Sequence, residues 1–343
     1  MQIFRHATRL SKDCRNSVAA LGNFDGFHRG HQAIVGEAGR IARSSSRQLA
    51  VFTTEPHPRS FFSSGGDRFR LTPFRERAHL LEEFGVDLMF VLPFDQALSE
   101  TGAETFITNI LARDLGISHA VIGYDYRFGQ GRGGDAALLR AVGKDCGIGV
   151  SVVEPVSVGV EGSAGEIYSS TLVRDALRAG GARRAAALLG HWWTVNGRII
   201  EGDKRGRTIG FPTANMTLGE SLVPAHGVYA VRVTLEGQFA GEPLEGVANV
   251  GRRPTFGDAG ILLEVHLFDF DEDIYGQHQA VELVGFIRRE RKFDGIDALK
   301  EQIAKDCKVA ERILADPENA RSRFDPPTLN RYLEMFPDPQ GVG

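Results

Sequence analysis

Cysteine is scarce in this chain, with three residues among 343. Cys14, Cys146 and Cys307 are too widely spaced to predict a metal knuckle or a disulfide framework, which excludes the small disulfide-stabilised class and favours a reducing compartment. Long apolar runs are also lacking: the first residues lead into no apolar signal core, and no uncharged run approaches membrane-spanning length. We therefore expect a cytoplasmic protein without a membrane partner.

Neither sign of charge dominates the composition. The 40 lysines and arginines against 44 aspartates and glutamates give a net charge of −4, so there is no reason to expect a nucleic acid as the main partner. Internal repeats and the Gly-x-x-x-x-Gly-Lys-Ser/Thr pattern are absent, which excludes a repeat protein and a P-loop enzyme. Because 343 residues exceed what one core usually supports, we expect two domains.

Short apolar runs alternate with helical periods between about residue 18 and residue 180. This alternation predicts a parallel sheet with helices on both faces, and ligands on such sheets bind beyond the carboxyl ends of the strands. The predicted strands are Val18–Leu21, Leu49–Thr53, Leu88–Leu92, Ala120–Gly123 and Val150–Val153, and the predicted helices span 31–43, 74–84, 103–115 and 135–146.

The pattern changes after a predicted helix end near Gly180. Residues 229–235 and 263–267 alternate apolar with polar residues between glycine-rich connections, which predicts an antiparallel sheet or barrel. An apolar stripe at helical spacing then predicts a long amphipathic helix. Beyond residue 316, proline and charged residues predict a loosely packed tail with a short helical piece. The expected domains are therefore 1–182 and 183–320, with a tail at 321–343. The stripe residues are Leu299, Ile303, Cys307, Ala310 and Leu314.

The segment from Leu21 to His31 joins the first strand to a helix start and carries two histidines around a glycine. Unpaired backbone N–H groups and the positive end of the helix dipole make such a start a natural seat for phosphate. Gly30 would let a phosphate approach the backbone closely, and His28 and His31 can donate hydrogen bonds to it. The alternative is two histidines that cap an ordinary helix, but the preceding strand and Gly-Asn-Phe-Asp-Gly favour the phosphate site.

Two further motifs follow predicted strands and should lie at the same edge. In Gly-Tyr-Asp-Tyr-Arg-Phe-Gly, which begins at Gly123, Asp125 could hold an acceptor or Mg²⁺ and the aromatic residues could sandwich a ring; a polar turn explains this stretch equally well. In Glu-Pro-His-Pro, which begins at Glu55, His57 between two prolines could line the pocket or serve structure alone.

Ser169-Ser170-Thr171-Leu172-Val173-Arg174 opens a helical stretch. Capping alone would explain the hydroxyls. Together with free N–H groups, however, they and Arg174 would form a second phosphate receptor. Two receptors on one sheet edge would suit a triphosphate held along its length.

The densest pattern of the second half runs from Gly202 to Asn215 and combines glycines, basic residues and Pro-Thr-Ala-Asn. A solvated basic hairpin would explain the loop but not its continuation. Thr213 and Asn215, two residues apart, can both reach a hard cation such as Mg²⁺, which takes few protein ligands. Glu264, on an alternating strand, is the candidate base for an alcohol substrate; its alternative role is an exposed strand carboxylate.

Together these motifs resemble the bacterial bifunctional riboflavin kinase/FAD synthetase (FMN adenylyltransferase) family from about residue 18 to residue 315. The first half carries Gly-Asn-Phe-Asp-Gly-Phe-His-Arg-Gly-His, Glu-Pro-His-Pro, Gly-Tyr-Asp-Tyr-Arg-Phe-Gly and Ser-Ser-Thr-Leu-Val-Arg, which look like adenylyltransferase motifs. The second half carries the glycine-rich Pro-Thr-Ala-Asn loop, Asn249–Phe256 and Leu263–His266, which look like kinase motifs. Both sets in this order are the specific part of the resemblance.

The resemblance implies a Rossmann-like nucleotidyltransferase domain followed by a six-stranded antiparallel barrel with a C-terminal helix. It implies that the second domain phosphorylates riboflavin with ATP to give FMN. The first domain would then join FMN to AMP from another ATP, releasing pyrophosphate and FAD. The implied substrates are riboflavin, FMN and ATP, with Mg²⁺ as cofactor. We expect a monomer or weak homo-oligomer.

The resemblance also implies roles for single residues. Glu264 would be the base for the terminal ribityl hydroxyl, His28 and His31 would stabilise phosphates, and Thr213 and Asn215 would contact Mg²⁺. Flavin contacts would come from His57, Asp125, Tyr126 and Arg127. The implied ATP-binding residues are Gly22, Asn23, Phe24, Gly30, Ser170, Thr171, Arg174, Lys204, Gly206, Thr213 and Asn215.

The departures from the family pattern remove no proposed catalytic group. Phe27 and Tyr126 replace residues of other size or polarity, and His191-Trp192-Trp193 replaces an Arg-x-Tyr type of start to the second module. Three alternatives stay open at this point. They are a chain with only one active module, a nucleotidyltransferase for another acceptor such as a nicotinate or pantetheine phosphate, and a non-enzymatic flavin sensor.

Overall fold

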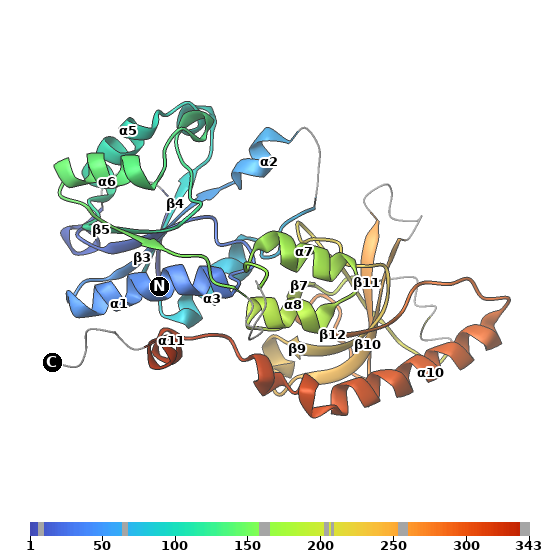
Figure 1. The fold of residues 1–343 in the computed structure, drawn as a ribbon. Coiled ribbons are helices and arrows are strands. Elements are labelled where there is room, and N and C mark those ends of the chain that lie inside the picture. The colour runs from blue at the N-terminus through green and yellow to red at the C-terminus, as the bar shows by residue number, and fades with distance from the viewer. Residues whose placement is uncertain are drawn as a thin grey trace. The chain divides into compact units, whose positions relative to one another are not determined.

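The computed structural model describes residues 1–5, 10–63, 68–157, 165–201, 206, 209–252 and 260–336. The chain divides into two compact units, each of which includes a short segment from the other half of the sequence (Figure 1). Among the described residues, no helix has the length and apolar character needed to cross a membrane. The first unit comprises Met1–Asp67, Phe74–Ser169 and Pro326–Gly343, and the second comprises Arg68–Pro73 and Ser170–Asp325.

The first unit is built on a six-stranded parallel sheet with the order β1-β4-β3-β2-β5-β6. Its five longer strands confirm the sequence prediction, whereas β1, a three-residue edge strand, was not predicted. The strands are β1 (Gln2–Phe4), β2 (Val18–Leu21), β3 (Leu49–Glu55), β4 (Leu88–Pro93), β5 (His119–Gly123) and β6 (Gly149–Val153).

Alternate residues of the central strands enter two separate apolar clusters, so the sheet is buried on both faces. Helices α1 and α3 cover one face, and the helical segments at 103–115 and 136–145 cover the other. The predicted helical segment near 103–115 is present, as α5 followed directly by a π-helical stretch, η2. The helices are α1 (Arg29–Ser44), α2 (Pro58–Phe62), α3 (Phe74–Phe84), α4 (Gln96–Ser99), α5 (Ala103–Thr105), η2 (Phe106–Leu115) and α6 (Ala136–Asp145).

The second unit contains a six-stranded antiparallel sheet with the order β7-β12-β9-β10-β11-β8. An antiparallel bridge between Ile200 and Asn215 joins the two ends of this order, so the sheet nearly closes into a barrel, as predicted. The strands are β7 (Thr194–Arg198), β8 (Ala214–Thr217), β9 (Gly227–Leu235), β10 (Leu244–Arg252), β11 (Ile261–Leu267) and β12 (His278–Arg288). Helices α7 (Ser170–Arg178) and α8 (Ala182–Leu189) precede them.

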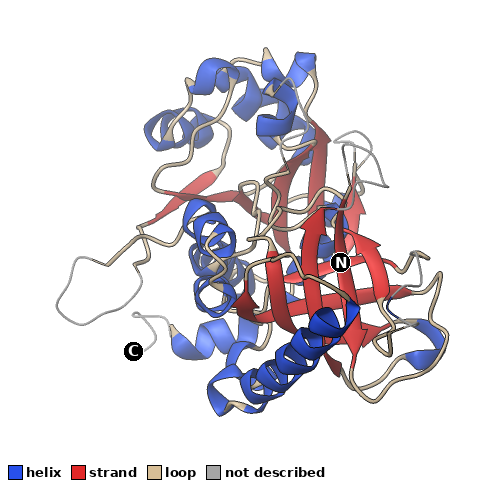
Figure 2. Cartoon of the chain, turned by 90° about the vertical axis from the view of Figure 1, so that its right-hand side faces the viewer, coloured by secondary structure: helices blue, strands red, loops and turns tan. Residues whose placement is uncertain are grey.

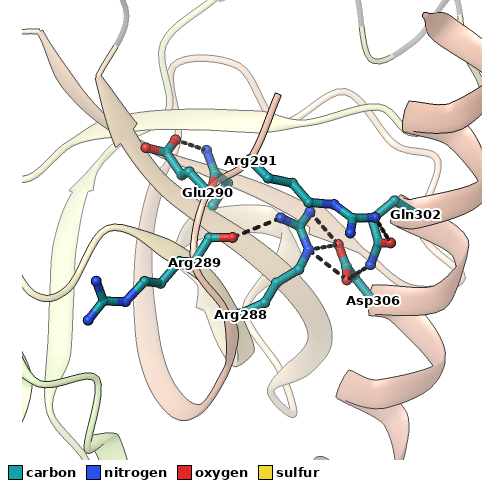
Figure 3. A network of polar contacts seen from close by, with 7 residues as sticks. Arg288, Arg289, Glu290, Arg291, Gln302 and Asp306 are labelled. Atoms are coloured by element: carbon teal, nitrogen blue, oxygen red, sulfur yellow. Dashed lines mark hydrogen bonds and ion pairs between the residues drawn. The ribbon is translucent and has the colours of Figure 1, made fainter. Parts of the chain in front are cut away.

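Helix α10 (Ile296–Ala315) packs along this sheet (Figure 2). Ala310 and Leu314 of the predicted stripe are buried against strand residues, and Cys307 is partly buried beside them. The stripe also carries a charge: Asp306 is 3% exposed and receives both Nε and an Nη of Arg288 from β12, at 3.0 and 2.7 Å (Figure 3). Gln302 donates a further hydrogen bond to Asp306, at 2.7 Å.

The tail after α10 does not pack as loosely as expected. It forms the predicted short helix, α11 (Leu329–Met335), and this helix belongs to the first unit. The 3₁₀ turns are η1 (Lys12–Cys14), η3 (Gln130–Arg132), η4 (Gly237–Phe239), η6 (Pro317–Asn319) and η7 (Arg321–Phe324).

Replacing Asp306 with alanine is expected to destabilise the second unit. The change leaves the Arg288 charge without its bidentate partner and costs about 3 kcal/mol, or about 6–12 °C in the unfolding temperature of a unit of this size. Thermal unfolding followed by circular dichroism measures the shift. Glu301→Ala is the matched control on the same helix, because its pair with Lys305 is exposed and should contribute nothing measurable. Equal behaviour of the two variants would contradict the prediction.

Candidate functional sites

The motifs of the first half meet where the strand order reverses. β2 lies between β3 and β5, so the connections on its two sides lead in opposite directions, and ligands of such sheets bind at the carboxyl ends of the strands at this point. Gly22–His28 follows β2 directly, Glu55 ends β3, and Tyr124–Arg127 follows β5. The predicted assembly of these motifs at one sheet edge is therefore confirmed within the first unit.

His28 and His31 form a stacked pair at the start of α1. Their ring centroids are 3.7 Å apart with an angle of 22° between the planes. His28 is the N-cap: its Nδ1 accepts the backbone N–H of His31 at 3.4 Å. Because Nδ1 accepts, the proton of the neutral His28 ring lies on Nε2. Capping and phosphate binding are thus compatible, since the cap occupies one ring nitrogen and orients the other as a donor.

The loop before α1 has an unusual backbone that buried side chains hold in place. Phe24, Gly26 and Phe27 have φ angles of 51°, 85° and 42°, values that aromatic residues rarely adopt and that concentrate at functional sites. Both phenylalanine rings are buried, and Phe27 packs edge-on against Phe84 with centroids 5.2 Å apart. Gln32 on α1 donates to the Phe27 carbonyl at 2.8 Å. Packing therefore fixes the path of this loop.

Gly22 and Gly30 leave room for the side chains around the histidine pair. A Cβ at Gly22 would lie 3.0 Å from Cζ of Phe24, the ring that contacts His31 edge-on at 5.3 Å. A Cβ at Gly30 would lie 3.2 Å from the His28 ring and 3.3 Å from the Tyr168 carbonyl oxygen. Both glycines thus support the histidine pair, while their contact with a nucleotide stays a prediction.

Arg77 on α3 is a site residue that sequence analysis missed. Its side chain is fully buried and connects two motifs: one Nη donates to the Asn23 carbonyl at 3.1 Å and the other to Glu55 at 2.7 Å. Thr54 adds a hydrogen bond to Oδ1 of Asn23, at 3.4 Å. The sequence offers no signal for this role, because an arginine in an amphipathic helix is ordinarily exposed.

The residues predicted to contact a flavin lie in different environments. His57 caps α2, its Nδ1 accepting the Arg59 N–H at 3.0 Å. Asp125 and Arg127 are exposed, whereas Tyr126 is half-buried and stacks on Phe128 with centroids 5.7 Å apart. Burial raises the pKa of the Tyr126 hydroxyl. Asp125 and Arg127 are therefore accessible to solvent, whereas the Tyr126 ring packs toward the core.

Ser170, Thr171 and Arg174 lie on α7, which belongs to the second unit. The Arg174 guanidinium lies over the Phe69 ring at 5.5 Å and donates from Nε to the Phe69 carbonyl at 2.8 Å. Segment 68–73 is thereby part of the same unit. The role of these three residues as a second phosphate receptor stays a prediction.

The polar motif residues of the second unit meet through strand register. Glu264 on β11 pairs directly with Asn215 on β8 and with Asn249 on β10, so the three side chains share one face of the sheet. Asn249 donates to Glu290 at 3.2 Å. Asn249 belongs to a motif that sequence analysis quoted without assigning it a role, and Glu290 was missed.

Contacts of the residues just before it hold Thr213 in place. It stands two residues before Asn215, so the two side chains are on the same side of the strand. Nδ1 of His266 donates to the Pro212 carbonyl at 2.8 Å. Gly206 packs so closely that a Cβ there would overlap the Phe211 carbonyl and lie 3.5 Å from the Thr213 hydroxyl. Close approach of the Phe211 carbonyl therefore requires glycine at position 206.

A cleft of about 440 Å³ adjoins this segment. It is lined by Thr213, by apolar residues of β8 and β11 and by the loop Phe270–Tyr275, with Asp271, Glu272 and Asp273. Asn215 and Glu264 are not among its lining residues. Within the described part of the chain, no cluster of three or more histidine, cysteine, aspartate or glutamate side chains could hold a metal. Lys204 and the stretch 253–256 lie outside the described residues.

Comparison with known proteins assigns the two halves to two families. The family model described as FAD synthetase matches residues 10–169, and the model described as riboflavin kinase matches residues 189–314. The bifunctional riboflavin kinase/FMN adenylyltransferase of Escherichia coli K12 is 39% identical over 307 residues, covering 89% of this chain and 96% of that protein. The protein of the same description from Bacillus subtilis is 36% identical, covering 90% and 95%.

A solved structure from Streptococcus pneumoniae described as a macrolide-efflux protein matches the fold with a TM-score of 0.78 at 31% identity. The match covers 90% of this chain and 98% of that one. Its description differs from those of the sequence relatives, which agree with one another and with both family models.

Replacing Arg77 with methionine is expected to loosen the loop between β2 and α1. The variant keeps much of the side-chain volume but leaves Glu55 and the Asn23 carbonyl without their donor, a loss of about 3 kcal/mol. Hydrogen exchange measured by mass spectrometry should show faster exchange in Gly22–His28. Arg140→Met on α6 is the control, because Arg140 is exposed and its replacement should leave exchange unchanged. A loop as protected in the Arg77 variant as in the parent would contradict the assignment.

Proposed function

The chain belongs to the bifunctional riboflavin kinase/FMN adenylyltransferase family, and on that basis we propose how its residues divide the two reactions. The protein phosphorylates riboflavin to FMN and adenylylates FMN to FAD. We assign adenylylation to residues 1–182 and phosphorylation to residues 183–320. The observation that carries this division is that each half brings its own motif residues together, at the edge of the parallel sheet and across three antiparallel strands.

In the adenylylation, a phosphate oxygen of FMN attacks the α-phosphorus of ATP and pyrophosphate leaves. The first turn of α1 offers backbone N–H groups to the phosphates. His28 and His31 donate hydrogen bonds to the oxygens on which charge develops, and stabilisation of that charge accounts for most of the rate in such reactions. The cap that leaves the His28 proton on Nε2 supports this role. No covalent enzyme intermediate is required.

The nucleotide and the flavin have separate groups of residues in this proposal. Gly22, Asn23, Phe24 and Gly30 shape the loop against which ATP binds, with Ser170, Thr171 and Arg174 as the second phosphate receptor. The flavin end uses His57, Asp125, Tyr126 and Arg127. Of these four, the exposed Asp125 and Arg127 are the better placed for direct polar contact, because the Tyr126 ring already packs on Phe128.

In the phosphorylation, Glu264 accepts the proton of the terminal ribityl hydroxyl as that oxygen attacks the γ-phosphorus of ATP. The register that pairs Glu264 with Asn215 and Asn249 supports this role, because it places the carboxylate on the same face of the sheet as the amides of the other two motif residues. Lys204 and Gly206 would contact the ATP phosphates in this proposal.

The Thr213 hydroxyl and the Asn215 amide oxygen would hold Mg²⁺. Both are hard oxygen donors on one side of the same extended segment, and Asn215 is 5% exposed. Two protein ligands suit this ion, which fills the rest of its shell with water and phosphate oxygens. When bound, Mg²⁺ supplies neutralisation of the charge on the transferred phosphoryl group.

We further propose that the enzyme works in the cytoplasm as a monomer or weak homo-oligomer, with riboflavin, FMN and ATP as its substrates and no nucleic-acid or membrane partner. The three unpaired cysteines and the nearly balanced charge support this assignment.

Glu264→Gln is expected to abolish FMN formation and leave FAD formation from supplied FMN intact. Loss of the base should slow phosphorylation by about 10²–10⁴-fold. Chromatographic separation of flavins after incubation with ATP and Mg²⁺ measures both reactions in one preparation. Glu245→Gln, an exposed glutamate on neighbouring β10, should behave like the parent. Loss of both reactions in the Glu264 variant would refute its role as a base.

His31→Ala should produce the reverse pattern, with FMN accumulating and little FAD. Removal of one donor to the developing charge is expected to reduce adenylylation by about 10²–10³-fold while phosphorylation continues. The same flavin separation, started from riboflavin, follows both products over time. His79→Ala on α3 is the control, since this histidine is exposed. FAD formation at the parent rate in the His31 variant would remove His31 from the mechanism.

A further inference from the structure

Helix α11, from the C-terminal end of the chain, packs directly on α1 (Figure 1). The fit depends on two glycines one turn apart on α1. A Cβ at Gly36 would overlap the Tyr332 ring, and a Cβ at Gly39 would lie 2.5 Å from Cδ1 of Leu329. Each glycine thus receives one side chain of α11, and α1 and α11 approach more closely than any larger residue would allow.

The contact extends along α1 and reaches its catalytic end. The Tyr332 hydroxyl donates to the Ala33 carbonyl at 3.4 Å, two residues after His31. At the other end, Arg43 donates to Oδ1 of Asn330 at 2.8 Å. Burial, with Glu37 nearby, raises the pKa of the Tyr332 hydroxyl.

The same contact joins the apolar cluster that fixes the histidine loop. Leu329 and Tyr332 pack against the cluster that contains Phe24 and Phe27. α1 also packs on the sheet through Val35, Ala38 and Ala42. Helix α1 is therefore held by both the sheet and α11.

We propose that FMN adenylylation depends on α11. In this proposal Tyr332 and Leu329 position α1 and, through it, His28 and His31. The inference rests on the proposed role of the histidine pair in adenylyl transfer. Residues 326–335 follow the kinase half in sequence and lie beyond both segments that match the family models, yet they belong to the adenylyltransferase unit. Substitutions in residues 326–335 should therefore impair FMN adenylylation, the reaction of the N-terminal half. They should leave riboflavin phosphorylation, the reaction of the preceding half, intact.

Gly36→Ala in the full-length enzyme tests the proposal. Alanine favours a helix over glycine, so any loss comes from the clash with Tyr332 and not from α1 itself. We expect kcat for FMN adenylylation to fall about tenfold or more, because small displacements of catalytic groups are costly. The KM values for ATP and FMN should change less than kcat, and riboflavin phosphorylation by the same preparation should stay within about twofold of the parent.

The Tyr332 variants separate positioning from general damage. Tyr332→Ala should itself lower kcat for adenylylation, and in that background Gly36→Ala should have no further effect, because the clashing ring is gone. Tyr332→Phe keeps the ring and should retain near-parental activity. Gly39→Ala with Leu329→Ala repeats the design at the second contact if the first glycine variant fails to fold. Gly102→Ala, where a Cβ meets nothing within 4 Å, is the control.

The outcomes test the role of α11 separately from the proposed role of the histidine pair. Parental adenylylation in Gly36→Ala, or an equal loss with and without Tyr332, would overturn the role of α11. If His31→Ala leaves FAD formation intact, the proposed function of the histidine pair fails, whatever the α11 variants do. Loss of adenylylation in both His31→Ala and Gly36→Ala, with phosphorylation preserved in both, supports the proposal.

Discussion

The start of α1 is the constraint on which the adenylyltransferase unit depends. A helix N-terminus has unpaired N–H groups that need a cap, but a phosphate site needs the same groups to be accessible. In the proposed site His28 would meet both demands, because its Nδ1 caps the helix and its ring, stacked on His31, keeps Nε2 as a donor. Phe24 and Phe27 hold the loop in its strained path, and Arg77 ties it to Glu55. The position of the histidine pair therefore depends on the buried side chains that pack beneath the loop.

In the kinase unit, the register of the strands determines where the polar motif residues lie. Glu264, Asn215 and Asn249 come from three strands and meet because each pair is directly opposite in the ladder. A slip of one residue would turn Glu264 to the other face, and buried Leu263 and Val265 on either side of it oppose that slip. The apolar alternation that makes β11 a strand thus also aims its carboxylate.

Sequence patterns predicted the features that depend on residues close together in the chain. The apolar run Val18–Leu21 and the histidine motif behind it indicated the first strand and its site, and both sheets were predicted with their correct class. Features that depend on partners distant in sequence were missed. Arg77 resembles an ordinary helix arginine until Glu55 is placed beside it, and Gly36 indicates nothing until Tyr332 packs on it. Asn249 needed the register of β10 against β11 before a role could be assigned.

The two units are not two consecutive pieces of chain, and this limits how they can be separated. Segment 68–73 supplies the Phe69 carbonyl to Arg174 and the Leu71 carbonyl to Nε1 of Trp193, at 2.8 Å each. Trp193 is 1% exposed, so its indole N–H would lose a buried partner without that segment. A cut near residue 182 would therefore remove Leu71 from the kinase unit and α11 from the adenylyltransferase unit. The bifunctional chain keeps both reactions together because each unit takes part of its core from the other half of the sequence.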